Sequence, residues 1–311
     1  MDGILIIDKP EGFTSHDVVA RLRRILKTKR IGHTGTLDPF ATGVLVMLVG
    51  KATRLAQFLD KDKKEYEAVV RFGFETDTGD RTGELRITNY ELRDFSGSEI
   101  ETVLKDFRGE IEQTPPMYSA KKIDGKKLYE LARKGVEVER KPVNVTIYEL
   151  ETIEPQRTQR KAEEESENQK PKTRDQTVRV CCSAGTYIRT LAEDIGRKLE
   201  TGAHLAELRR TRAGRFDLSN AVTLEELETI VAENKLNEIL ISTNQAVAHL
   251  PEFVLNEPQI KDTQNGKRLR FENAELADNQ LLRMTDAAEN LIAVGFYLKE
   301  EKSVQPKLVL I

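Results

Sequence analysis

The chain has 311 residues, of which 38% are hydrophobic and 32% are charged, and its formal net charge is −3. No apolar run reaches the roughly 20 residues that a membrane-spanning helix requires. The two cysteines, Cys181 and Cys182, are adjacent, which excludes an ordinary disulfide framework and a four-cysteine metal site. The length favours one large domain followed by a smaller one, and the composition indicates a cytoplasmic protein.

The N-terminal half predicts strands alternating with helices. An apolar stretch between Asp2 and Asp8 carries acids on both sides and predicts a first strand, not a signal peptide. Thr14 and Asp17 have the spacing of a capping box, and apolar residues at helical spacing follow them. The elements expected next are a buried strand over 44–49, a helix over 51–59, strands over 65–72, 142–150 and 177–182, and a helix over 186–199.

Two later segments differ from this pattern. Residues 155–176 are polar and charged without a large apolar residue, which predicts a disordered or extended insertion between two strands. From about Pro251, short β-like runs separated by Gly and Asn predict a small β-rich domain over 250–311, after a helical stretch over 224–232. The combination of sheet-forming runs and helices predicts an α+β fold.

Basic residues are concentrated in two regions despite the acidic total. Residues 1–64 hold twelve Lys and Arg against seven acids, and residues 117–141 hold eight against four. A third basic stretch follows His204 and includes Arg209 and Arg210. Local basic surface suits a polyanion such as nucleic acid, although ordinary solvated faces have the same composition.

The turn around Asp38 is the strongest candidate for chemistry. Pro39 biases Asp38 toward an extended backbone, and three glycines nearby permit close approach of another backbone segment. A carboxylate presented in this way can act as a nucleophile or a general base, while an Asp-Pro pair in a glycine-rich segment is also an ordinary turn. Tyr187 and Arg189 lie at a predicted strand-to-helix junction, where Arg189 can pair with a carboxylate.

Several motifs for other chemistry are missing from the sequence. It contains no HxxEH, no paired CxxC, no Walker loop and no GxGxxG. Metal, nucleotide and nicotinamide chemistry therefore have no support, and we expect neither a metal nor a cofactor.

Several long motifs, in order from residue 2 to about 225, resemble the bacterial TruB family, the tRNA pseudouridine(55) synthases. The segments that carry the resemblance are 7–15, 32–43, 76–80, 113–120, 125–129, 185–191 and 202–204, with Tyr66 in its strand. The C-terminal part is loosely similar to the small PUA-type RNA-binding domain that often ends such enzymes.

The resemblance implies a pseudouridine synthase fold, with a mixed, mainly antiparallel sheet and flanking helices, over residues 1–245. It implies an isomerase that extrudes the T-loop uridine of tRNA and uses Asp38 as the catalytic carboxylate without a cofactor. Residues implied to contact the substrate are Lys9, His33, Tyr66, Tyr187, Arg189 and Leu208. Asp80 matches the family as well, without a clear role.

Phosphate contacts are expected from a mobile, thumb-like arm over 117–141. The basic residues predicted to bind RNA are Lys121, Lys122, Lys126, Lys127, Arg209 and Arg210. We expect a monomer that needs no obligate protein partner and no membrane.

Two other interpretations remain open at this stage. A guide-RNA-dependent pseudouridine synthase has the same catalytic motifs but works with partner proteins. A non-catalytic RNA-binding or tRNA-folding protein with the same fold is the second, which the complete set of candidate catalytic residues disfavours.

Overall fold

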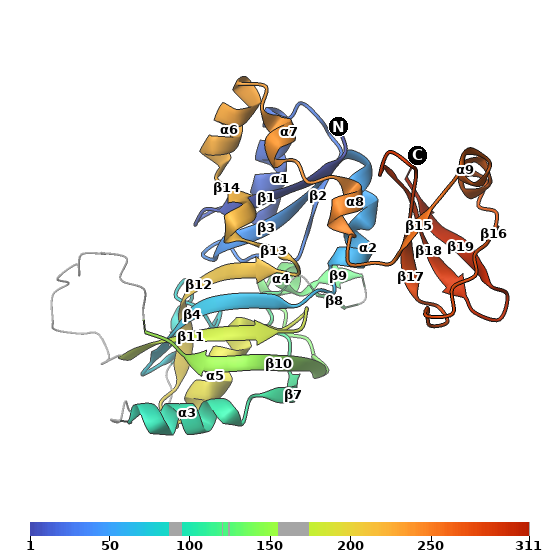
Figure 1. The fold of residues 1–311 in the computed structure, drawn as a ribbon. Helices are drawn as coiled ribbons and strands as arrows, with labels where there is room; N and C mark the ends of the chain where they lie inside the picture. Colours follow the sequence, from blue (N-terminus) through green and yellow to red (C-terminus); the bar gives the residue numbers. More distant parts are fainter. Residues whose placement is uncertain (87–94, 120, 124, 155–173, 311) are drawn as a thin grey trace.

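The computed structural model describes residues 1–86, 95–119, 121–123, 125–154 and 174–310 (Figure 1). Ten strands of these residues form one sheet with the order β14-β1-β3-β12-β4-β11-β10-β7, in which β2 also pairs with β3 and β13 with β12. Their bounds are β1 (Gly3–Lys9), β2 (Ile31–Thr34), β3 (Thr42–Val49), β4 (Lys64–Phe72), β7 (Gly109–Gln113), β10 (Val143–Thr152), β11 (Arg174–Cys182), β12 (Ala203–Ala213), β13 (Phe216–Asp217) and β14 (Ala221–Val222).

The large sheet is mixed but mainly antiparallel, as predicted. Only the β1–β14 and β3–β12 pairs are parallel among its described strands. Gly43 permits the second of these contacts, since its φ is +98° and a Cβ there would lie 2.2 Å from the carbonyl oxygen of Arg210. Only glycine tolerates that backbone conformation and that proximity together.

Helices pack on the large sheet and on one another (Figure 1). Helix α1 begins after Thr14, whose capping box with Asp17 is confirmed. It contacts β2 and α6, while α5 packs on β12 and α3 on β10. The helices and helical turns of this part are α1 (Ser15–Ile25), η1 (Gly50–Leu55), α2 (Ala56–Leu59), α3 (Gly97–Lys105), α4 (Leu128–Ala132), α5 (Ile188–Lys198), η2 (Leu218–Asn220), α6 (Leu224–Ala232), α7 (Leu236–Ile239) and α8 (Thr243–Ala246).

A second sheet of five described strands, in the order β15-β17-β18-β19-β16, follows near the C-terminus. This sheet confirms the predicted β-rich C-terminal part. A helix, α9, which was not predicted from the sequence, lies between β15 and β16 in the chain. The bounds are β15 (Glu252–Val254), α9 (Glu257–Gln264), β16 (Leu269–Arg270), β17 (Leu281–Thr285), β18 (Leu291–Leu298) and β19 (Ser303–Val309).

The two sheets share an apolar core. Leu291, Val294 and Leu308 of the second sheet belong to the same buried cluster as Ile4 and Val46 of the first. The side chain of Arg54 also donates a hydrogen bond to the carbonyl oxygen of Val309.

The structure corrects one bound of the predicted insertion and describes most of the predicted arm. Residues 155–173 lie outside the described residues, but residues 174–176 are the start of β11, so the insertion does not extend to Gln176 as expected. Asp175 is fixed there by Arg71, whose Nε and Nη2 atoms lie 2.7 and 2.8 Å from its carboxylate. The arm contains α4 and the hairpin strands β8 (Lys122–Ile123) and β9 (Lys126–Lys127); β5 (Glu75–Thr76) and β6 (Leu85–Arg86) form another short hairpin.

Candidate active site

The loop between β2 and β3 holds Asp38 in a fixed conformation. The Ser15 hydroxyl, at the start of α1, donates to the carbonyl of Leu37 at 3.2 Å and accepts from its N–H at 2.9 Å. On the other side of Asp38, the N–H of Gly12 donates to the carbonyl of Pro39 at 2.8 Å. The backbone on both sides of Asp38 is therefore attached to the N-terminal segment.

Lys9 supports the same loop from below. Its side chain is fully buried, and Nζ donates to the carbonyls of Pro10, Phe13 and Pro39 at 2.8, 2.6 and 3.2 Å. Burial lowers the pKa of Lys9 to about 8, so the amine still carries its proton at neutral pH. Lys9 does not line the candidate cavity as the resemblance implied, because these three carbonyls hold its ammonium behind the loop.

Arg189 lies opposite the loop, in the first turn of α5, and contacts Asp38 directly. Nε lies 3.0 Å from Oδ2 of Asp38 and Nη2 lies 3.3 Å from Oδ1. The same guanidinium donates to the carbonyls of Thr78 at 2.9 Å and Tyr118 at 2.7 Å. A planar guanidinium with this many fixed partners orients the carboxylate as well as balancing its charge.

Two opposing effects act on the pKa of Asp38. Burial raises its pKa above the usual value, and the nearby charge of Arg189 opposes that rise. The Asp38 side chain is 33% exposed, whereas the Arg189 side chain is 6% exposed. The carboxylate is thus partly desolvated, held by a buried cation and still accessible, which suits a nucleophile.

A cavity of about 430 Å³ opens beside Asp38 and brings together most of the predicted substrate residues. Tyr66 is buried in the central strand β4, and burial raises its pKa, so it remains a neutral phenol. The N–H of Tyr187 is fixed by Oε1 of Gln113 at 3.0 Å. The lining includes His33, Gly35, Asp38, Asp60, Lys64, Tyr66, Ser119, Tyr187, Arg189, Leu208 and Arg210.

His33 lines the cavity from β2 as a neutral imidazole. Burial, together with the nearby charges of His16 and Arg210, lowers the pKa of His33 to about 4. Its ring packs edge-on against that of His16 at a centroid distance of 5.7 Å. A neutral aromatic ring at the cavity is suited to contact with a nucleobase.

Arg209 and Arg210, which were predicted to bind RNA with a solvated basic face as the alternative, both form contacts within the protein. They lie in the sheet on β12, and neighbouring residues of a strand point to opposite faces. Arg209 forms an ion pair with Asp8, with Nη2 and Oδ2 2.7 Å apart. Arg210 is 1% exposed and donates to the carbonyls of Val44 and Gly35 at 2.7 and 2.9 Å. Arg210 is therefore part of the cavity wall.

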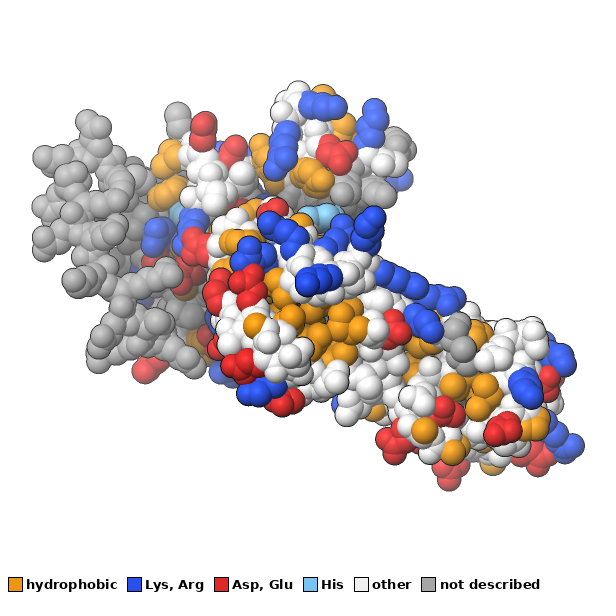
Figure 2. Space-filling model, turned by 90° about the horizontal axis from the view of Figure 1, so that it is seen from above, with side chains coloured by type: hydrophobic (Ala, Val, Ile, Leu, Met, Phe, Trp, Pro, Cys, Tyr) orange, Lys and Arg blue, Asp and Glu red, His pale blue; other side chains and the backbone are white. Residues whose placement is uncertain are grey.

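The arm lies next to this site. The N–H of Leu128 donates to the carbonyl of Lys121 at 2.8 Å, and that of Tyr129 to the carbonyl of Ser119 at 3.1 Å. Lys126 is exposed, as a phosphate contact requires, and the side chains of Lys122 and Lys127 lie outside the described part of the structure. Figure 2 shows Lys and Arg side chains gathered over the middle of one face, whereas the second sheet, on the right, mixes both signs of charge.

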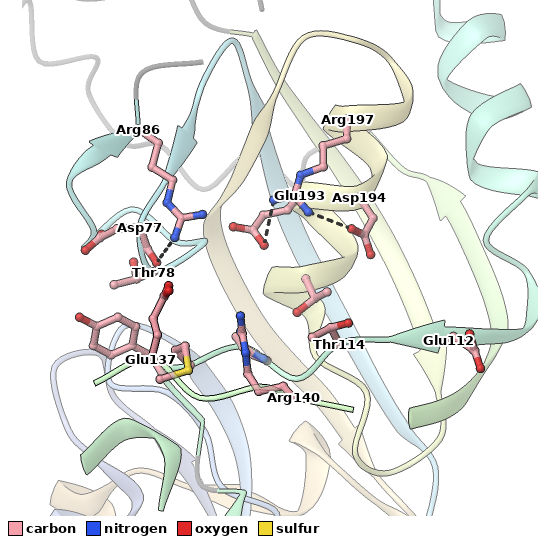
Figure 3. Close-up of a pocket in the computed structure, with 14 residues that line it drawn as sticks. Asp77, Thr78, Arg86, Glu112, Thr114, Glu137, Arg140, Glu193, Asp194 and Arg197 are labelled. Atoms are coloured by element: carbon pink, nitrogen blue, oxygen red, sulfur yellow. Dashed lines mark hydrogen bonds and ion pairs between the residues drawn. The ribbon is translucent and has the colours of Figure 1, made fainter. Parts of the chain in front are cut away.

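A second cavity, of about 370 Å³, is lined by residues of the arm, of α5 and of the segment around Thr78 (Figure 3). Thr78 and Tyr118, whose carbonyls accept hydrogen bonds from Arg189, line it. Glu137 and Arg140 of the arm face the α5 residues across this cavity, among them Glu193. The arm and the residues that contact Arg189 therefore line one cavity.

The sequence reading missed residues that position the site. Ser15, Gln113 and Lys64 contact or line it. Ser15 and Gln113 lie in segments that carry the resemblance but received no role, and Lys64 lies outside those segments. Among the described residues, no group of three or more His, Cys, Asp or Glu side chains could hold a metal ion. None of the described helices is long and apolar enough to cross a membrane.

Comparison with known proteins places this geometry in context. Residues 23–188 match the family model for the TruB family pseudouridylate synthase (N terminal domain), and residues 189–248 match that for the tRNA pseudouridylate synthase B C-terminal domain. The chain is 44% identical to a tRNA pseudouridine synthase B of Geobacillus thermodenitrificans, with 96% of this chain and 95% of the relative covered. It is 40% identical to that of Bacillus cytotoxicus, covering 100% and 98%.

Solved structures similar to this chain include a Cbf5-Nop10-Gar1 complex and an archaeal box H/ACA sRNP Nop10-Cbf5 complex. The matched chain of the first is 28% identical, with a TM-score of 0.73, and the match covers 99% of this chain and 85% of that one. The second is also 28% identical, with a TM-score of 0.71.

Proposed function

The chain belongs to the TruB family of pseudouridylate synthases, and we propose that it isomerises a uridine of tRNA to pseudouridine at the Asp38 cavity. The observation that carries this assignment is the contact of Asp38 with Arg189, at 3.0 Å, in a cavity that Tyr66 and Tyr187 also line. A carboxylate, its charge partner and aromatic rings are the groups that this reaction needs.

The reaction breaks the N1–C1′ glycosidic bond and forms a C5–C1′ bond, with loss of the C5 proton and gain of a proton at N1. Asp38 acts as the carboxylate that takes part while the glycosidic bond is broken, and Arg189 favours its ionised form and orients it. Tyr187 is placed to contact the base and to assist proton transfer. No atom is gained or lost overall, so no redox group or external donor is required.

The target nucleotide has to leave its stack to reach Asp38, which costs a few kcal/mol. Stacking of the flipped uracil on the Tyr66 ring returns about 1–3 kcal/mol. His33, neutral at physiological pH, enters the space that the base vacates. Leu208 completes an apolar side of the cavity.

The specific substrate is the T-loop uridine at position 55, and residues 1–245 are the catalytic domain. Residues 250–311 are a PUA-like RNA-binding domain, and the arm over 117–141 contacts phosphates. We further propose that the enzyme acts as a monomer on the cytoplasmic tRNA pool and needs no protein partner, although the similar solved structures are complexes.

Tritium release from tRNA labelled at uracil C5 tests the proposal. The purified chain alone should release tritium from an unmodified tRNA transcript, and a transcript with cytidine at position 55 should release none from that site. Release only after addition of a guide RNA and partner proteins would assign the enzyme to the guided class instead.

A further inference from the structure

Lys64 is a buried cation without a hydrogen-bond partner in the described structure. It is the first residue of β4, two residues before Tyr66, and only 5% of its surface is exposed. Its Nζ atom is buried and no hydrogen bond to it is formed within the described residues. A buried ammonium is normally paired, because removing its water without replacement is unfavourable.

A second cation stands beside it. The charge of Arg210 is among the causes, after burial, that lower the pKa of Lys64. The two side chains meet beneath Gly35, where a Cβ would lie 3.3 Å from Nη1 of Arg210 and 3.5 Å from Cε of Lys64. Gly35 has a φ of +67°. Gly35, Lys64 and Arg210 all line the same cavity.

No acid accepts a hydrogen bond from the Lys64 ammonium within the part of the chain that the structure describes. Asp62 and Asp60 favour the charged form of Lys64, and Asp60 lines the same cavity, but neither is a hydrogen-bond partner of Nζ. Cys182, opposite Lys64 on β11, is a neutral thiol because burial raises its pKa to about 12. Two adjacent cations in this position favour entry of an anion.

We propose that Lys64 and Arg210 form a subsite for one oxyanion, a backbone phosphate next to the uridine that enters the cavity. The inference rests on the proposed function, which supplies RNA as the ligand. Tyr66, the two cations and the reacting carboxylate of Asp38 line the same cavity. A nucleotide on Tyr66 therefore directs its sugar to Asp38 and its phosphate to the cations.

Single methylphosphonate linkages, which remove one phosphate charge, test the subsite in a T-stem-loop RNA. One RNA carries the substitution on the 5′ side of the target uridine, one on the 3′ side and one in the distant stem. One flanking substitution should weaken binding by the wild-type enzyme about tenfold. Lys64→Met should bind the unmodified RNA about tenfold more weakly and lose nothing further with that substitution.

Lys63→Met is the matched control, because Lys63 is exposed and lies over the ring of Tyr148. It should respond to the methylphosphonates as the wild type does. Two results would overturn the subsite. One is that a flanking methylphosphonate weakens binding by Lys64→Met as much as it weakens binding by the wild type. The other is that neither flanking substitution weakens binding by the wild type. Inorganic phosphate that raises the wild-type Tm while both flanking substitutions bind normally would also overturn it, since the anion would then be a free one.

Folding is measured separately without RNA. Lys64→Met should melt at the wild-type temperature or above, because it removes a buried unpaired charge while keeping a similar volume. A lower Tm for this variant would indicate a structural role and contradict the proposal. Tritium release by the wild type is followed in the same series: its absence refutes the proposed function, whereas the binding cycle depends on affinity alone.

Discussion

Asp80 forms a second ion pair with the guanidinium of Arg189, with Oδ2 of Asp80 3.5 Å from Nη1 of Arg189. Asp80 is itself buried, and its Oδ1 accepts hydrogen bonds from the N–H of Thr82 at 2.9 Å and the hydroxyl of Thr78 at 3.0 Å. The position of the cation opposite Asp38 is therefore fixed by a second carboxylate.

Asp80→Asn should lower kcat about 10- to 100-fold and leave the Kd for tRNA within about threefold, since it acts through Arg189. The negative charge of Asp80 helps to raise the pKa of Asp38, so the acid limb of the kcat profile should move to lower pH in the variant. Asp77→Asn, an exposed change in the same loop, is the control. An unmoved acid limb with normal kcat would show that Asp80 does not influence the site.

Asp38→Asn should reduce tritium release by about a thousandfold or more while tRNA affinity stays within about tenfold, because one carboxylate affects the chemistry far more than the phosphate contacts. Asp106→Asn, which removes an exposed acid paired with Lys198, should leave both quantities unchanged. Substantial isomerisation by the Asp38 variant would refute its catalytic role.

Arg189→Met and Arg189→Lys should both lose at least about a hundredfold in kcat. Lysine keeps the charge but cannot donate to two carboxylates and two carbonyls at once. The Met variant should also lower the Tm, because Asp80 is left buried without its cation. Turnover near the wild-type rate in either variant would place Arg189 outside the chemistry.

Glu193 makes folding stability depend on pH. Burial raises its pKa from 4.5 to about 7, and its side chain is 15% exposed. The folded state therefore binds a proton more tightly than the unfolded chain, and stability falls as pH rises from about 4.5 through about 7, by about 1–3 kcal/mol in all.

Glu193→Gln should flatten the dependence of Tm on pH across this range and raise the Tm at pH 8. The exposed change Glu238→Gln provides the comparison. An equally steep profile in the Glu193 variant would assign the effect to other groups.

Replacement of Lys121, Lys122, Lys126 and Lys127 by alanine should weaken tRNA binding and flatten its salt dependence together. Each lost phosphate contact lowers the slope of log affinity against log salt by somewhat less than one unit. Lys235, which pairs with Glu233 on the surface, gives the control variant. A slope identical to that of the wild type would show that the arm lysines are ordinary solvated charges.

The sequence predicted the loop of Asp38, the helix start at Arg189 and the mainly antiparallel sheet, because capping, periodicity and long motifs are local properties. The burial of Arg210 and the ion pair of Arg209 could not be predicted, since a run of arginines indicates phosphate contacts or a solvated face as long as the strand is not known to be central. Period-two alternation then sends Arg209 to Asp8 and Arg210 into the interior.

Lys64 was missed for the opposite reason. It follows Lys61 and Lys63 in a polar stretch, so composition predicts exposure. Its burial comes from the neighbouring strands β11 and β12, which pair with β4 at Cys182 and Ala213. These contacts join residues more than a hundred positions apart, which no local pattern can indicate.

The apolar cluster shared by the two sheets has a consequence for how the chain unfolds. Val294 and Leu308 belong to the same buried apolar cluster as Ile4 of β1 and Val46 of β3. Separation of the two parts would expose side chains of this cluster to water, so neither part gains stability by melting alone. The protein should unfold as one cooperative unit in calorimetry. A chain shortened before β15 would leave apolar side chains of this cluster exposed to water.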